Sequence, residues 1–295
     1  MTALFDIPIQ ALMGQLMLGL VNGSFYAVLS LGLAVIFGML NIINFAHGAL
    51  YMMGAFLAWM GLEYMGIGYW PALILAPLAI GVFGVLIERG MLRWLYKLDH
   101  LYGLLLTFGL ALVIEGLFVN AYGVSGQPYQ IPAQLAGGFN LGFMFLPYYR
   151  GWVIFASLMV CFATWYGIEK TRLGAYLRAA TENPQLTQAF GINVPIMVML
   201  TYGFGAALAG FAGVLAAPVI QVSPLMGSHL IITVFAVVVI GGMGSILGSI
   251  ITGLGLGVIE GITNLLYPAA SNTVVFVIMA IVLMVRPAGL FGKEK

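Results

Sequence analysis

The chain has 295 residues, of which 62% are hydrophobic and 6% are charged, and its formal net charge is +1. Soluble domains carry about 25% charged residues, so this composition excludes an ordinary water-facing surface. A nearly neutral chain also lacks the basic surface that nucleic acids require, so no nucleic-acid partner is expected. Charged residues are absent between Asp6 and Glu63 and between Glu182 and Glu260. Each stretch is long enough for more than one membrane crossing, because one helix needs about 20 apolar residues to cross the bilayer core.

The apolar segments, taken in chain order, predict an all-α polytopic membrane protein with about eight or nine transmembrane helices in the lipid bilayer. The first segment is long and carries Asn22-Gly23 near its middle, so we expect it to be tilted or broken there. Two later segments are short for a crossing, and one of them fits a re-entrant path. We interpret residues 1–295 as a single transmembrane domain. Its apolar segments are 10–38, 44–64, 69–90, 101–121, 151–168, 195–217, 228–243, 245–266 and 271–286.

The short loops that carry Lys and Arg mark the cytoplasmic side of a membrane protein. These residues gather in 88–100, in 169–194 and in the tail after Val285, so these segments are expected in the cytoplasm. The segment 122–150 has Arg150 as its one basic residue and is rich in Gly, Pro and aromatic residues, so it is expected outside. The sequence leaves open whether one segment is re-entrant, and therefore on which side the N-terminus lies.

The stretch from Asn183 to Gly191 contains the signals of a short capped helix. Asn183 suits the N-cap, Pro184 suits the first helical position, and Gly191 suits the left-handed residue that ends a helix. One interpretation is a surface helix between two membrane segments, and the other is a docking element for a cytoplasmic motor. The chain contains no G-x-x-x-x-G-K-[ST] motif. ATP-driven work would therefore need a separate subunit.

Polar residues inside apolar segments need partners or contact with water, so they are candidates for a pathway. Asn22, Ser24 and Tyr26 follow the expected break, where they either line a pathway or repair the freed backbone. Glu115 and Glu260 each lie about 14 residues into their segments, which predicts one common depth in the bilayer. These carboxylates either meet a solute or act as structural acceptors.

The stretch NIINFAHGAL, residues 41–50, places Asn41, Asn44 and His47 three residues apart. In a helix this spacing brings side chains to roughly one face. A short connection near lipid leaves backbone groups unpaired, so we expect these side chains to tie the connection together by hydrogen bonds. A role in the pathway or its gating is the alternative interpretation.

Glycine is abundant, with 40 residues, and several pairs are four apart, such as Gly19 with Gly23 and Gly253 with Gly257. Such pairs let helix backbones approach closely in lipid. The stretch GGMGS, residues 241–245, lacks the Lys of a nucleotide-binding loop and is expected to pack helices at a break. The packing candidates there are Gly241, Gly242, Gly244 and Gly248.

The reactive side chains are few and scattered. Three histidines and the single Cys161 form no spacing typical of a metal site or of a nucleophile with its base. We therefore expect no metal, no cofactor in this chain, and no enzymatic activity of its own.

The sequence resembles the permease subunits of branched-chain amino acid ABC importers almost from end to end. The resemblance is carried by GLVNGSFYAVLSLGLAVIFGMLNIINFAHGALYMMGAF, RAATENPQLTQAFGINV, GAALAGFAGVL, VVVIGGMGSILGSIITGLGLGVIE and the closing RPAGLFG. It implies a subunit that forms half of a translocation pathway for branched-chain or related amino acids in the bacterial inner membrane. Similar permeases carry urea and short amides, which are the alternative substrates. A stand-alone channel or a secondary transporter is a further alternative. Members usually have an acidic residue directly after NFAHG, whereas this chain has Ala49.

The resemblance also implies partners. These are a second, related permease, two ATPase subunits that bind ATP and Mg, and a periplasmic binding protein that captures the solute. The loop around Arg178 to Gly191 would then be a coupling helix docked on an ATPase, with charged contacts from Arg178 and Glu182 and an apolar face from Leu186 and Phe190. The residues assigned to coupling are Arg178, Glu182, Asn183, Pro184, Leu186, Phe190 and Gly191.

Overall fold

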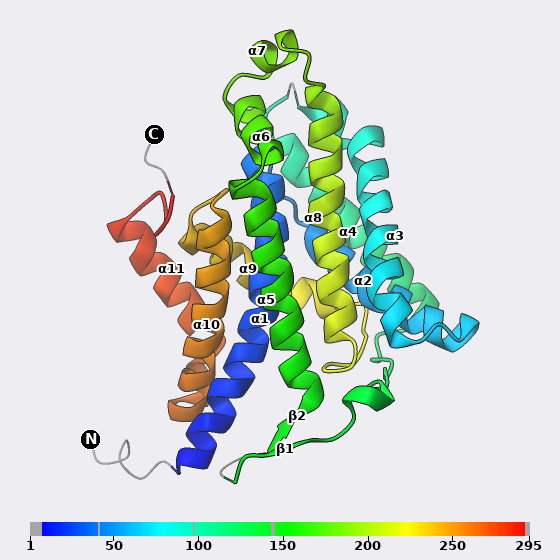
Figure 1. The fold of residues 1–295 in the computed structure, drawn as a ribbon, viewed down its shortest axis with the longest axis vertical. Helices are drawn as coiled ribbons and strands as arrows, with labels where there is room; N and C mark the ends of the chain where they lie inside the picture. Colours follow the sequence, from blue (N-terminus) through cyan, green and yellow to red (C-terminus); the bar gives the residue numbers. More distant parts are fainter. Residues whose placement is uncertain (1–7, 41, 97, 143–144, 293–295) are drawn as a thin grey trace.

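The structure is a computed structural model that describes residues 8–292 except 41, 97 and 143–144. Over this part of the chain it is a bundle of eleven α-helices with one two-stranded antiparallel sheet (Figure 1). Every apolar segment expected from the sequence coincides with a helix, which confirms the all-α polytopic fold. The elements are α1 (Ile9–Leu40), α2 (Ala46–Met65), α3 (Tyr69–Gly90), η1 (Leu92–Leu95), α4 (His100–Tyr122), η2 (Ala133–Leu135), β1 (Gly138–Asn140), β2 (Phe145–Pro147), α5 (Tyr148–Glu169), α6 (Arg172–Glu182), α7 (Pro184–Ala189), α8 (Val194–Ala216), α9 (Met226–Gly241), α10 (Ile246–Leu266), η3 (Pro268–Ala270) and α11 (Val274–Val285).

Helices α1 and α10 lie against each other through the glycine pairs that the sequence singled out. A Cβ added at Gly23 would lie 2.9 Å from the carbonyl oxygen of Leu254, and one at Gly253 would lie 2.6 Å from the backbone nitrogen of Ala27. Gly257 contacts the backbone of Gly23 directly. The two backbones therefore meet with no side chain between them, as is typical of small-residue contacts in lipid.

A second glycine contact joins α8 to α2 and α3 in the centre of the bundle. A Cβ added at Gly54 of α2 would lie 2.5 Å from the Cα of Gly210 in α8. On the other side of α8, a Cβ at Gly203 would lie 3.0 Å from the carbonyl oxygen of Gly81 in α3. Helix α8 is thus held between two neighbours, and most of its residues are buried.

The expected break of the first helix at Asn22-Gly23 is wrong. Helix α1 runs without interruption over 32 residues, from Ile9 to Leu40. Gly23 does not kink α1. It contacts α10, because the absence of a side chain lets the backbone of α10 approach closely. An unbroken helix keeps its backbone hydrogen bonds internal, which the bilayer core requires.

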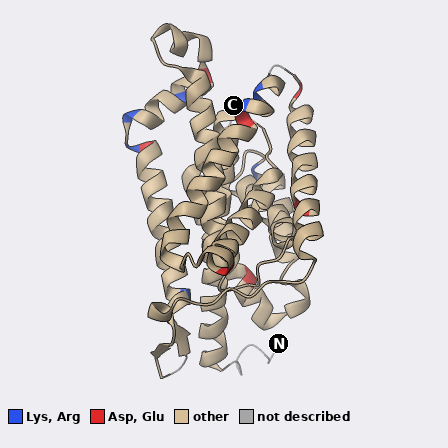
Figure 2. Cartoon of the chain, turned by 90° about the vertical axis from the view of Figure 1, so that its right-hand side faces the viewer, with Lys and Arg blue, Asp and Glu red and all other residues tan. Residues whose placement is uncertain are grey.

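The bundle has two distinct ends. Helices α6 and α7 project from one end, and the β1–β2 hairpin lies at the other, within the loop expected outside (Figure 1). Figure 2 shows most Lys and Arg residues toward the end that carries α6 and α7, as the orientation expected from the sequence requires. At the hairpin end, Gln127 and Val222 exchange two backbone hydrogen bonds of 2.8 and 2.9 Å. They join the loop after α4 to the link between α8 and α9.

Six of the described helices are long and apolar enough to cross a membrane, namely α1, α3 with η1, α4, α5, α8 and α10. Helices α9 and α11 are apolar but have 16 and 12 residues. At 1.5 Å per residue they span about 24 and 18 Å, less than a bilayer core of about 30 Å. The count of eight or nine crossings therefore stays a prediction.

Replacing Gly257 by Leu is expected to destabilise the bundle, because the new side chain would meet the α1 backbone at Gly23. Overpacking of this kind costs about 1–3 kcal/mol. The thermal midpoint of the purified protein in detergent, read by fluorescence-detected size exclusion, should fall. Gly255→Leu on the same helix is the matched control, because nothing lies within 4 Å of a Cβ at Gly255. Equal midpoints for the two variants would contradict the glycine contact.

Candidate functional site

The short helix α7 has the local structure that the sequence predicts. The side chain of Asn183 accepts a hydrogen bond of 2.9 Å from the backbone nitrogen of Leu186. Pro184 occupies the first turn, and Gly191 follows the helix with a φ of 84° in the left-handed region. Cap, proline and glycine fix both ends of a six-residue helix that is too short to be stable alone.

Helix α7 lies at the tip of the bundle (Figure 1), and large apolar side chains of this region are exposed. Leu186 is 54% exposed and Phe190 is 79% exposed, and Glu182 is exposed at the end of α6. Thr187 points the other way and is buried. Leu186 and Phe190 are thus exposed apolar side chains outside the long apolar helices of the bundle.

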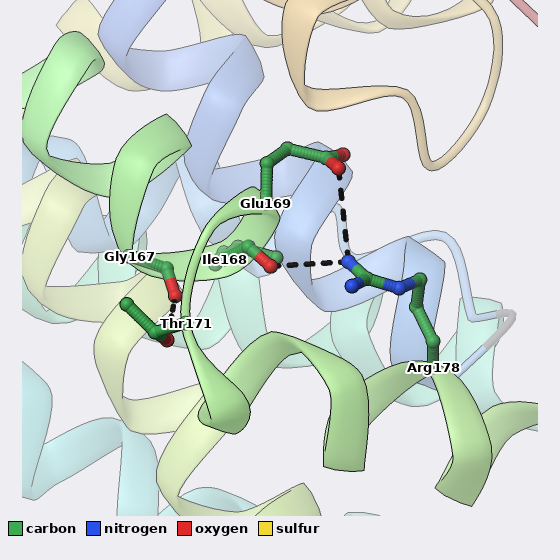
Figure 3. A network of polar contacts seen from close by, with 5 residues as sticks. All are labelled: Gly167, Ile168, Glu169, Thr171 and Arg178. Atoms are coloured by element: carbon green, nitrogen blue, oxygen red, sulfur yellow. Dashed lines mark hydrogen bonds and ion pairs between the residues drawn. The ribbon is translucent and has the colours of Figure 1, made fainter.

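Arg178 makes two polar contacts within the chain while its side chain stays about half exposed, and its contact with a partner stays a prediction. Its Nη1 donates a hydrogen bond of 3.0 Å to the carbonyl oxygen of Ile168 and lies 3.7 Å from Oε2 of Glu169 (Figure 3). Beside it, the hydroxyl of Thr171 donates to the carbonyl of Gly167. These contacts satisfy carbonyls at the end of α5 and hold α6 at a fixed angle to it.

Asn44 and His47 tie the start of α2 to two other helices. The amide of Asn44 donates a hydrogen bond of 3.0 Å to the Tyr202 hydroxyl in α8. One nitrogen of His47, Nε2, lies 3.0 Å from the carbonyl oxygen of Leu29 in α1, and both polar side chains are buried. Asn41 lies outside the described residues. The hydrogen bonds are those of a structural clasp between α1, α2 and α8.

Thr107 of α4 completes this connection between α1 and α2. Its hydroxyl accepts from the backbone nitrogen of Phe45 at 3.2 Å and lies 3.2 Å from the carbonyl oxygen of Ile43. No sequence pattern points to Thr107 or Tyr202, because each is a polar residue within an apolar helix whose partner is remote in sequence.

The polar residues expected after a break in α1 take separate positions along the intact helix. Asn22 is exposed, and the buried Ser24 donates a hydrogen bond of 2.8 Å to the carbonyl oxygen of Leu20. Tyr26 donates a hydrogen bond of 2.7 Å to Oε2 of Glu260 in α10. Because α1 is continuous here, its backbone groups are not freed and need no side chains to satisfy them. Tyr26 instead provides a hydrogen-bond partner for the carboxylate of Glu260.

The turn between α9 and α10 is built from the GGMGS glycines. Gly242 and Gly244 have φ values of 99° and 84°, which side-chain-bearing residues rarely adopt. A Cβ added at Gly241 would lie 2.8 Å from the carbonyl oxygen of Gly248, across the turn. The segment after α11 closes over it, as Leu290 donates a hydrogen bond of 2.8 Å to the carbonyl oxygen of Ile240.

A cavity of about 280 Å³ lies between α2, α4 and α9. Its polar side chains are Glu115 of α4 and Ser228 of α9, and the Ser228 hydroxyl donates to the Glu115 carboxylate. Ala49, at the position where the resemblance leads us to expect an acidic residue, also lines it, so Glu115 is the carboxylate of this cavity. The remaining lining residues are Phe45, Gly48, Met52, Phe108, Ala111, Leu112, Pro224, Gly227, Ile231 and Ile232.

A second cavity of about 390 Å³ lies between the end of α3 and the start of α8. Arg89, Arg93 and the buried Glu88 line it, and Glu88 accepts a hydrogen bond of 2.7 Å from the Tyr96 hydroxyl. Burial and the nearby carboxylate raise the pKa of Tyr96, so its hydroxyl remains a donor at neutral pH. Sequence reasoning used these arginines for orientation only and did not foresee the cavity.

The long apolar helices, packed into one bundle, define a multi-pass α-helical membrane protein. The model of the family described as branched-chain amino acid transport system / permease component matches residues 15–285. The chain therefore belongs to this family of transport permeases.

Individual relatives agree with the family and cover nearly the whole chain. The high-affinity branched-chain amino acid transport system permease protein BraD of Pseudomonas aeruginosa is 32% identical over 95% of this chain and 96% of its own length. The corresponding permease protein LivH of Escherichia coli K12 is 28% identical over 95% of this chain and 96% of its own. LivM of the same system and organism is 28% identical over 75% of this chain and 57% of its own. No solved structure matches the chain.

Replacing Asn44 by Ala is expected to lower the stability of the protein. The change leaves the buried Tyr202 hydroxyl without its partner, which costs about 1–3 kcal/mol. Thermal unfolding in detergent measures the loss. Asn22→Ala, at an exposed position of α1, is the control and should leave the midpoint unchanged. A midpoint for Asn44→Ala equal to that of the control would show that the clasp contributes nothing.

Proposed function

We propose that this chain is one of two permease subunits of an ATP-driven importer for branched-chain or related amino acids in the bacterial inner membrane. The proposal is supported by the family and by BraD and LivH, whose names give a high-affinity branched-chain amino acid transport system. In this proposal a periplasmic binding protein delivers the solute to the hairpin end. Two ATPase subunits bind ATP and Mg at the opposite end, because this chain has no nucleotide-binding motif of its own.

The observation that carries the proposal is the exposed apolar pair of α7. Leu186 and Phe190 lie at the end of the bundle toward which Lys and Arg gather, which the positive-inside rule assigns to the cytoplasm. Helix α7 is capped at both ends, and it follows α6, which Arg178 joins to the end of α5. We therefore assign α7 as the coupling helix that seats in an ATPase subunit.

The second permease subunit is expected to share this fold. LivM, the product of another permease gene of the same system, is similar to 75% of this chain. A chain that is related to both permeases of one system fits a pair built from two related halves. Pairing also covers polar groups such as Glu115, which lies half-buried on an intramembrane helix where exposure to lipid would cost about 3 kcal/mol.

Removing the apolar face of α7 with Leu186→Ser and Phe190→Ser is expected to disconnect the ATPases. The chain would be co-expressed with the products of its neighbouring genes, purified in lipid nanodiscs and assayed for ATP hydrolysis with and without leucine-loaded binding protein. Wild type should retain the ATPase subunits and be stimulated by the loaded binding protein. The double variant should lose at least tenfold of both the bound ATPase and the stimulated rate.

The matched control is Phe139→Ser with Leu141→Ser, an exposed apolar pair in the hairpin region at the opposite end of the bundle. It should keep the bound ATPase and the hydrolysis rate measured without binding protein, because it lies at the end opposite α7. Equal losses of bound ATPase in the two double variants would refute the coupling role of α7. Leucine uptake by vesicles that contain this chain alone would favour a channel or secondary transporter instead.

A further inference from the structure

Glu115 is a carboxylate in an unfavourable place for a lone subunit. It lies about 10 Å before the end of α4, a helix of 23 residues that is long enough to cross the bilayer core. Its side chain is half-buried, and its neighbours Leu112 and Leu117 on the same helix are exposed. A carboxylate inside the hydrocarbon region faces protein or a water-filled cavity, since contact with lipid is costly. The cavity between α2, α4 and α9 is the space that Glu115 lines.

Apart from this carboxylate and the Ser228 hydroxyl, the cavity wall is apolar. Aromatic and aliphatic surface comes from three helices. It is contributed by Phe45, just before α2, Met52 of α2, Phe108 of α4 and Ile231 of α9. A binding site for a small molecule has this composition, with a mostly hydrophobic lining and a few polar groups that orient the ligand. The wall suits an aliphatic group of a few carbon atoms, and the carboxylate suits a cation attached to it.

Two helices also begin at this cavity. The first turns of α2 and α9 supply Gly48, Gly227 and Ser228 to its lining, and neither helix has a side-chain cap. The two turns are in contact, as a Cβ added at Gly48 would lie 2.8 Å from the carbonyl oxygen of Gly227. Helix N-termini carry partial positive charge from their unpaired N–H groups. The same wall therefore combines a negative side chain with positive backbone ends a short distance away.

We propose that this cavity is a transient site for the amino-acid cargo within the permease. The Glu115 carboxylate takes the α-ammonium group, the apolar wall takes the aliphatic side chain, and the α-carboxylate lies toward the first turns of α2 and α9. This assignment rests on the proposed function, because it needs an amino acid to be released into the membrane domain. Glu115 is then a binding group for the cargo, and Ser228 positions its carboxylate through a hydrogen bond.

Glu115→Gln tests the role of the charge, because the amide keeps the size of the side chain and can still accept from Ser228. In proteoliposomes that contain the full transporter, the initial rate of leucine uptake is expected to fall at least tenfold. ATP hydrolysis stimulated by the loaded binding protein should stay within twofold of wild type. Glu115→Asp should recover part of the uptake, and Glu63→Gln, at the exposed end of α2, should transport like wild type.

These readouts separate the cargo site from the proposed function. If uptake falls while stimulated hydrolysis is kept, the importer is intact and the cargo site is supported. If Glu115→Gln transports leucine at the wild-type rate, the cargo site is refuted while the importer stands. If wild type itself shows no stimulated hydrolysis, the proposed function fails, and with it the premise of the cargo site.

A cysteine at Leu112 tests directly whether water and cargo reach the cavity. The native Cys161 is buried, so an introduced thiol gives the main signal. In the assembled transporter, Leu112→Cys should react with a water-soluble methanethiosulfonate at least tenfold faster than Ile74→Cys, a control on the exposed face of α3. Leucine-loaded binding protein with ATP should slow the reaction at Leu112→Cys only. Equal rates at the two positions, or no slowing by leucine, would overturn the cargo site.

Discussion

The close contact of helix backbones at glycine is the constraint on which the rest of this bundle depends. Lipid tails are as apolar as the side chains of the helices, so association gains little from excluding them. Dispersion between surfaces that touch over a large area has to supply the stability, and it falls steeply with any gap. Glycine contacts bring three helix pairs together at backbone distance. Gly23 and Gly257 join α1 to α10, Gly54 and Gly210 join α2 to α8, and Gly81 and Gly203 join α3 to α8.

Two sets of polar side chains within the helix bundle differ in their surroundings. Asn44, His47 and Tyr26 find partners within the chain and act as fasteners between helices. Glu115 and Ser228 pair with each other but stay at the wall of a cavity. A membrane protein that only needed to be stable would have no use for the second set, because an apolar side chain there would cost less. The cavity is therefore the part of the structure that stability alone does not explain.

The sequence predicts the local features of this protein well and the remote ones poorly. The apolar segments became helices because length and hydropathy decide helix formation in lipid, and the cap at Asn183 is encoded within nine residues. The break expected at Asn22-Gly23 was wrong. A glycine that lets a neighbouring helix approach cannot be told by sequence from a glycine that kinks its own helix. Tyr202 as partner of Asn44 could not be predicted, since 158 residues separate them. The same holds for Ser228 beside Glu115.

The pair of hydrogen bonds between Gln127 and Val222 makes the outer loop and the approach to α9 one mechanical unit. Helix α9 starts only four residues after Val222, and its first turn forms a wall of the cavity. A protein that docks on the outer loop would therefore be connected to the cavity wall through these hydrogen bonds, without contacting the cavity itself. At the far end of α9, the segment after α11 is bonded to the carbonyls of Ile240 and Gly241. The approach to this short helix and its far end are thus each bonded to a segment that lies outside the long helices of the bundle.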